Sequence, residues 1–194
     1  LLALLLLSPV LLLIAVAVKI DSPGPVFYKP EVIGLNGTLF KMFKFRSMQM
    51  DSDNAIHKDY VSKLINGEIE KETVEDKPLK ITDDPRVTRV GCFLRKSSLD
   101  ELPQLFNILQ GNMSLVGPRP CLPYEFALYK EWYKKRTIVQ PGITGLWQIT
   151  GRSEVVFEDM ILLDFYYIFN RNIILDFNII FETIFVVLGR KGGY

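Results

Sequence analysis

The sequence predicts an α+β fold, a helix-rich domain bound to one side of a membrane. Three observations predict it: the first 18 residues carry no charge, a hairpin signal stands at Asn36-Gly37, and apolar residues recur at helical spacing after residue 97. The 194-residue chain is 48% hydrophobic with a mean hydropathy of +0.18, which is high for a soluble protein. We therefore expect a membrane helix over residues 1–20 and a cytosolic-face domain with interfacial amphipathic helices over residues 21–194.

The apolar N-terminal segment is expected to enter and leave the membrane on the same side. Residues 1–18 would form a straight helix of about 27 Å, barely the hydrocarbon thickness of a bilayer. Pro9 frees the carbonyl of Leu5 and should break the helix, and Ser8 can repair part of that loss with a local hydrogen bond. A helix broken at Ser-Pro would allow a re-entrant path, with both ends of the segment on one side of the membrane. A cleaved signal peptide is the alternative, although no basic segment precedes the apolar run.

A small β-hairpin is expected directly after this helix. Residues 26–48, VFYKPEVIGLNGTLFKMFKFRSM, read as two strands around Asn36-Gly37, which is a strong hairpin signal. Lys44 and Arg46 end the second strand. Taken alone, they would be ordinary strand charges.

Four further helices are expected, over residues 53–65, 122–136, 154–169 and 173–188. The second of these combines aromatic side chains with a basic end, which suits a membrane interface. Packing of its aromatic side on the core, with a solvated basic end, is an equally good interpretation. The last helix is apolar nearly all round but too short and too polar to span a bilayer, so we expect it to lie at the interface.

Composition excludes several classes of function. The net charge of +1 argues against a nucleic-acid-binding protein. Cys92 and Cys121 do not suggest a disulfide framework, which favours a reduced, cytosol-facing domain. The single histidine, His57, leaves no two-histidine zinc site and no Ser-His or Cys-His nucleophile system. A metal would therefore need oxygen ligands, which indicates Mg²⁺ or Mn²⁺.

The segment SSLDELPQLFNILQGNMSLVGPRP, residues 97–120, carries the candidate chemistry. Its apolar run predicts a helix that ends at Gly111. Pro103 is tolerated only in a first turn, so the helix should begin near Asp100, with that residue as N-cap and Glu101 beside it. For an arbitrary Asp-Glu pair, a purely structural cap is the favoured explanation.

Basic residues around the Asp-Glu pair favour a functional interpretation. Arg119 is held between Pro118 and Pro120, which restrict its backbone. Carboxylates, guanidinium groups and a helix N-terminus together suit phosphate groups bridged by a metal. A solvated basic face is the alternative. The upstream cluster consists of Arg86, Arg89, Arg95 and Lys96.

Four motifs carry a resemblance to a known family. They are SLDELPQLFNILQGNMSLVGPRP at 98–120, KFRSM at 44–48, PGITGLWQITGR at 141–152 and LDFYY at 163–167. In this order, over nearly the whole chain, they resemble the bacterial sugar transferase family, whose members are monotopic phosphoglycosyl transferases. A motif as long as the first is far more specific than a short pattern.

The resemblance implies transfer of a sugar 1-phosphate from a UDP-sugar to polyprenyl (undecaprenyl) phosphate, with release of UMP. This reaction initiates exopolysaccharide, capsule or O-antigen synthesis. In the family the Asp of the Asp-Glu pair is the nucleophile, so Asp100 is expected to form a covalent phosphosugar intermediate. Glu101 would assist through proton transfer or the metal site, and both carboxylates would bind Mg²⁺ or, alternatively, Mn²⁺.

The resemblance also implies substrate contacts and a location. It places the protein on bacterial inner membrane lipid, at the cytosolic face, with a homodimer as one option. Larger members have an insertion corresponding to residues 49–82 and a similar ending, so we expect the catalytic portion of a longer protein. The expected substrate-binding residues are Lys44, Arg46, Arg95, Arg119, Arg152 and Asp164.

Two other functions remain as alternatives. Asp51-Ser52-Asp53 matches the Asp-x-Asp metal motif of glycosyltransferases that release UDP, but this pattern is short and lies in a polar stretch. The parallel nucleotide-binding sheet that usually surrounds it is not predicted. A membrane assembly protein without chemistry would leave the charges from Asp100 to Arg119 unexplained.

Overall fold

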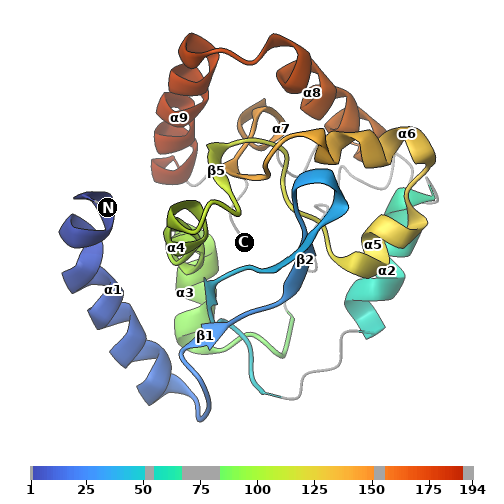
Figure 1. The fold of residues 1–194 in the computed structure, drawn as a ribbon. Coiled ribbons are helices and arrows are strands. Elements are labelled where there is room, and N and C mark those ends of the chain that lie inside the picture. The colour runs from blue at the N-terminus through green and yellow to red at the C-terminus, as the bar shows by residue number, and fades with distance from the viewer. Residues whose placement is uncertain (1, 51–54, 67–83, 151–155, 190–194) are drawn as a thin grey trace.

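The computed structural model describes residues 2–50, 55–66, 84–150 and 156–189 (Figure 1). Arg152, Asp51-Ser52-Asp53 and most of the expected insertion therefore lie outside the described residues. The structure mixes helices with short strands, as the sequence predicts. The helices are α1 (Leu2–Asp21), α2 (Ala55–Ile65), α3 (Arg89–Ser97), α4 (Gln104–Leu109), α5 (Pro123–Leu128), α6 (Glu131–Lys134), α7 (Leu146–Thr150), α8 (Phe157–Asn170) and α9 (Ile173–Leu188). The strands are β1 (Phe27–Tyr28), β2 (Glu31–Ile33), β3 (Leu39–Lys41), β4 (Lys44–Phe45), β5 (Ser114–Val116) and β6 (Gly142–Thr144).

The predicted hairpin is confirmed, but its strands form two short ladders. β2 pairs antiparallel with β3 through a turn in which Asn36 has φ 52° and Gly37 has φ 78°. These left-handed backbone angles are the reason that Asn-Gly suits the turn. β1 pairs with β4 further along. Pro30 lies between β1 and β2 and has no N–H to donate, which accounts for the interrupted ladder.

A parallel strand pair, which the sequence did not predict, forms between β5 and β6. The chain comes so close here that a side chain would not fit: a Cβ on Gly142 would lie within the contact distance of the Gly117 backbone nitrogen. The pair is fastened to α9 by a 2.7 Å hydrogen bond between the hydroxyls of Thr144 and Thr183. It thereby fixes the position of the Pro118–Pro120 loop, which directly follows β5.

Helix α1 continues through Pro9, so the predicted break in the helix is not present. The Ser8 hydroxyl donates a 2.8 Å hydrogen bond to the carbonyl of Leu5, which is the expected local repair. By length and composition, Ala3–Asp21 is long and apolar enough to cross a membrane. Its C-terminal half packs on α3, where Val18 is buried in a cluster with Phe45 and Leu94.

The expected helix over residues 122–136 is broken at Tyr129, whose backbone is extended (φ −69°, ψ 136°). The break allows Tyr129 and Tyr133 to turn into the core, where they pack against Phe157. Core packing is therefore the correct interpretation of these aromatic residues, and the membrane-interface interpretation is wrong for both. The basic end is not fully solvated either, because Arg136 is buried.

Arg136 forms a buried ion pair with Asp164, which is 1% exposed. Burial raises the pKa of Asp164 to about 6, while Arg136 opposes this rise, so the carboxylate is ionised at neutral pH. The hydroxyl of Tyr129 accepts a further 3.2 Å hydrogen bond from Arg136 Nη1. The pair joins α8 to the segment after α6 and contributes to the organisation of the core.

Replacing one member of this pair should destabilise the protein strongly. Asp164→Asn keeps the side-chain volume but leaves the Arg136 charge buried without a counterion, which costs about 3–5 kcal/mol. Urea unfolding of the purified protein in detergent would measure the loss. The matched control is Asp59→Asn, which removes the exposed Asp59–Lys63 pair and should cost less than about 1 kcal/mol. Equal losses in the two variants would contradict this account.

Candidate functional site

Asp100 and Glu101 lie in a 3-10 turn, Leu99–Glu101, and not at the start of a helix. Helix α4 begins only at Gln104, so the predicted helix start near Asp100 is wrong. Ser98 has a left-handed backbone (φ 56°) that ends α3 and turns the chain. Gly111 ends the segment with φ 76°, as expected. Because the side chain of Asp100 caps no helix, the purely structural cap is not supported.

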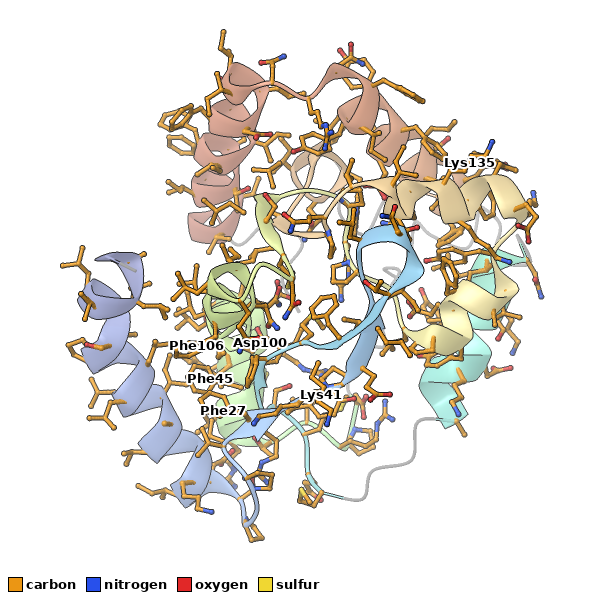
Figure 2. All side chains as sticks on the ribbon, viewed as in Figure 1. Phe27, Lys41, Phe45, Asp100, Phe106 and Lys135 are labelled. Atoms are coloured by element: carbon orange, nitrogen blue, oxygen red, sulfur yellow. The ribbon has the colours of Figure 1, made fainter. Side chains whose placement is uncertain are left out.

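One pocket brings together three of the expected site residues: Lys44, Glu101 and Arg119. Lys44 Nζ lies 2.8 Å from Glu101 Oε1, and both side chains are mostly buried. The contact is possible because β4, which carries Lys44, packs against the 3-10 turn. Figure 2 shows Asp100 where the strand ribbon meets α3 and α4. Residues separated by more than fifty positions in sequence are thus adjacent at the pocket.

Burial raises the pKa of Asp100 to about 6. Lys44 lowers that pKa, the neighbouring Glu101 raises it, and Arg95 lowers it again. At neutral pH the carboxylate is therefore mostly ionised. Its desolvation and its cationic neighbours are the features expected of a functional carboxylate.

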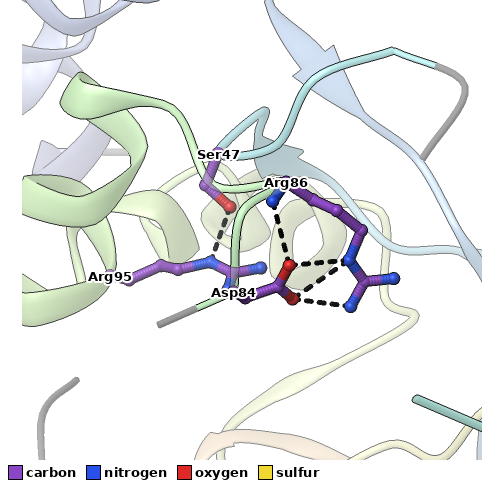
Figure 3. Close-up of polar contacts among 4 residues, drawn as sticks. All are labelled: Ser47, Asp84, Arg86 and Arg95. Carbon is purple, nitrogen blue, oxygen red and sulfur yellow. Dashed lines mark hydrogen bonds and ion pairs between the residues drawn. The ribbon is translucent and has the colours of Figure 1, made fainter. Parts of the chain in front are cut away.

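Arg95 is the member of the upstream basic cluster that acts on Asp100. Its Nε donates a 2.9 Å hydrogen bond to the Ser47 hydroxyl (Figure 3). Nearby, Asp84 forms an ion pair with Arg86, with 2.6 Å between Asp84 Oδ2 and Arg86 Nη2. This ion pair lowers the pKa of Asp84, chiefly through the side-chain hydrogen bonds from Arg86. Arg86 is therefore engaged in a local ion pair, whereas Arg95 contributes positive charge towards Asp100.

Arg46, expected to bind substrate, has structural partners in the fold. Its buried guanidinium donates hydrogen bonds of 2.5 Å to the carbonyl of Pro23 and 2.8 Å to that of Ser22. Asp21 acts similarly, because its carboxylate accepts a 3.0 Å hydrogen bond from the Val90 N–H in the first turn of α3. These contacts tie the end of α1 to the elements that carry the site.

Not all expected site residues lie at the pocket. Asp164 is in the core ion pair and does not line the pocket, so its role in substrate binding stays a prediction. Arg152 lies outside the described residues. Gln104 and Gln148 also line the pocket, although no local sequence pattern predicts a role for either. The only sequence signal for them is that each falls inside one of the long motifs.

The site fits a metal only in part. Among the described residues, no group of three or more His, Cys, Asp or Glu side chains is placed to hold an ion. Asp100 and Glu101 offer carboxylate oxygens, which suit Mg²⁺. Because Mg²⁺ is commonly held by one or two carboxylates together with substrate phosphates, the pair suits a metal shared with substrate better than a fully protein-bound one.

Known proteins are similar in sequence to this chain over nearly all of its length. The family model for bacterial sugar transferases matches residues 1–190. The exopolysaccharide production protein ExoY of Sinorhizobium fredii is 42% identical over 193 residues, which cover 100% of this chain and 83% of ExoY. The undecaprenyl-phosphate galactose phosphotransferase of Salmonella typhimurium is 42% identical over 96% of this chain.

Several of these relatives are much longer than the chain. It spans 38% of the Salmonella protein and 40% of an uncharacterized sugar transferase of Haemophilus influenzae that is 42% identical to it. The undecaprenyl-phosphate glucose phosphotransferase of Komagataeibacter xylinus is 44% identical over 94% of the chain, which spans 33% of that protein. The motifs, the pocket that brings three of them together and these similarities agree, and the chain belongs to the bacterial sugar transferase family.

Proposed function

We propose that this protein moves a sugar 1-phosphate from a UDP-sugar to undecaprenyl phosphate and releases UMP, which initiates synthesis of a bacterial surface glycan. The observation that carries the proposal is the pocket in which Lys44, Glu101 and Arg119 meet beside the desolvated carboxylate of Asp100. Relatives named as undecaprenyl-phosphate galactose and glucose phosphotransferases support the two substrate classes.

Asp100 is the nucleophile in this proposal. A carboxylate oxygen of Asp100 attacks the β-phosphorus of the UDP-sugar, the bond to the bridging oxygen breaks, and UMP leaves with that oxygen. An oxygen of undecaprenyl phosphate then attacks the same phosphorus and displaces Asp100, which gives undecaprenyl diphosphate sugar. Lys44 and Arg119 neutralise phosphate charge that would otherwise repel the carboxylate. Arg95 keeps the carboxylate ionised.

Mg²⁺, held by Asp100 and Glu101 with the substrate phosphates, would supply additional neutralisation of charge. Glu101 has a second role available, because its contact with Lys44 orients the ammonium group towards the pocket. These assignments rest on the chemistry of the side chains and on the family.

Exposed apolar surface supports attachment to the cytosolic face of the inner membrane. On α1, Leu6 and Leu13 are each 71% exposed. Figure 1 shows α1 and α9 along the same side of the molecule, so one lipid surface can contact both. Exposed apolar residues of α9 are Ile173, Ile174, Phe177, Phe181, Ile184 and Phe185. We further propose that the membrane segment is re-entrant, with both ends of α1 on the cytosolic side, and that the protein is a homodimer, which cross-linking in membranes would test.

A covalent intermediate is the sharpest test of the mechanism. With a UDP-sugar alone, the enzyme should release at most one UMP per active site, and mass spectrometry should find sugar phosphate on the peptide containing Asp100. Asp100→Asn should abolish both signals and lower turnover roughly a thousandfold or more, whereas Glu101→Gln should retain a slow adduct. A fully active Asp100→Asn enzyme would rule out the mechanism. Release of UDP instead of UMP would favour the Asp-x-Asp glycosyltransferase alternative. Absence of any reaction with UDP-sugars would favour the assembly-protein alternative.

Activity should depend on a hard divalent cation. Protein stripped of metal should lose turnover in excess EDTA and regain it with Mg²⁺ or Mn²⁺, since carboxylate and phosphate oxygens prefer such ions. Circular dichroism in EDTA serves as the control for folding. Full turnover of the stripped protein in EDTA would refute the metal requirement.

Membrane topology can be tested by cysteine labelling in sealed vesicles. In a background with Cys92 and Cys121 replaced by serine, Leu2→Cys and Ser22→Cys should react with an impermeant reagent on the same side. Pro9→Leu should shift the segment towards spanning, because a helix former replaces proline, which weakens a helix by removing a backbone hydrogen bond. Labelling on opposite sides with Pro9 intact would disprove the re-entrant proposal.

The pH profile should report the ionisation of Asp100. Because its pKa is raised to about 6, kcat/KM for the UDP-sugar should fall as the pH drops through that value and the nucleophile becomes protonated. Lys44→Met should move this acidic limb of the pH profile to higher pH, because the Lys44 ammonium group lowers the pKa of Asp100. Lys41→Met, on the neighbouring strand, is the matched control and should leave the limb in place. An unchanged limb in Lys44→Met would contradict the assignment.

A further inference from the structure

Helix α4 carries two buried side-chain amides with different surroundings. Asn107 is 0% exposed and is fully engaged with the backbone of the neighbouring strand segment. Its Oδ1 accepts a 2.8 Å hydrogen bond from Phe43 N–H, and its Nδ2 donates one of 2.8 Å to the carbonyl of Lys41. Asn107 therefore anchors α4 to the strands that position Lys44.

Gln104, one turn earlier on α4, is 2% exposed but lacks such partners. Within the described part of the chain, no hydrogen bond to its side-chain amide is found. Buried amides in folded proteins nearly always have hydrogen-bonding partners, and an unpaired one is destabilising. Gln104 lines the same pocket as Lys44, Glu101 and Arg119. The partner of this amide is therefore expected among the groups of a bound ligand.

The chemistry of the pocket indicates which ligand group this is. Lys44 and Arg119 are charged and suit phosphate oxygens, whereas the neutral amide of Gln104 offers both a donor and an acceptor, as hydroxyl groups require. Gln104 follows Asp100 by only four residues, and Glu101, the direct neighbour of Asp100, lines the same pocket. In a UDP-sugar, the sugar is bonded directly to the phosphate under attack, while the uracil ring is separated from it by a second phosphate and a ribose.

We propose that Gln104 is a specificity-determining residue that hydrogen-bonds a hydroxyl of the sugar in the donor substrate. The inference rests on the proposed function, because it assigns part of the same pocket. It makes Gln104 responsible for discrimination between sugars and not for the chemical step. A site that hydrogen-bonds a hydroxyl discriminates strongly against a donor that lacks it, because the buried amide is then unpaired.

The test compares Gln104→Met with the wild-type protein on a panel of donors. The panel contains UDP-glucose, UDP-galactose, monodeoxy analogues of whichever sugar the wild type prefers, and the CDP form of that sugar. UMP or CMP release gives kcat/KM for each pair. We expect that removal of one particular hydroxyl lowers kcat/KM of the wild type about tenfold or more, and kcat/KM of Gln104→Met less than about threefold. Other deoxy positions should show equal losses in both proteins.

Two control variants separate this role from a structural one. Gln110→Met makes the same substitution at the exposed end of α4, outside the pocket lining, and should retain the wild-type donor preferences. Asn107→Ser should lower unfolding stability and reduce kcat/KM for all donors in parallel.

Three results would overturn the inference while leaving the proposed function intact. Gln104→Met could keep the wild-type kcat/KM for every donor, or it could lower kcat/KM by the same factor for every donor. The substitution could also change the preference between the UDP and CDP forms and leave the effect of every sugar hydroxyl unchanged. Failure of the wild type to release UMP from any UDP-sugar would overturn the proposed function and the inference with it. Measuring the wild type first distinguishes these cases.

Discussion

The ion pair between Lys44 and Glu101 is the contact on which the site depends. It joins the N-terminal strand ribbon to the 3-10 turn that carries Asp100, across more than fifty residues of sequence. Without it, a cation would have no fixed place beside the desolvated carboxylate. Asn107 supports the same junction from α4 through two backbone hydrogen bonds. The site is thus assembled between two structural units and belongs to neither alone.

The basic residues fall into two groups that differ in their contacts and in their roles. Arg46 and Arg136 are buried and bonded to backbone carbonyl groups or to a carboxylate, so they organise the fold. Lys44, paired with Glu101, and Arg119 both line the pocket, where their charges can attract phosphate groups. Through its contacts with the turn after α1, Arg46 also connects the expected membrane helix to β4. The proposed membrane attachment and the geometry of the pocket therefore share one structural link.

Local sequence signals predicted much of the fold and the chemical character of the site. The Asn36-Gly37 turn, the termination of the α4 segment by Gly111, just after the helix, and helix α9 over Ile173–Leu188 follow from turn chemistry and periodicity, and all three are confirmed. The family followed from long motifs, which also indicated Asp100 and Glu101. In each case the information lies within a few neighbouring residues, so no long-range contact is needed to recognise it.

By itself, then, the sequence determined the family, the principal helices and the candidate carboxylates. Only the tertiary structure decided the parallel pairing of β5 with β6, the break at Tyr129 and the engagement of Arg46 with backbone carbonyls. It also revealed that Gln104 is buried at the pocket. These features depend on which distant groups meet and lose contact with water. Periodicity and turn chemistry report local preference, whereas burial and partner choice are fixed by the whole fold.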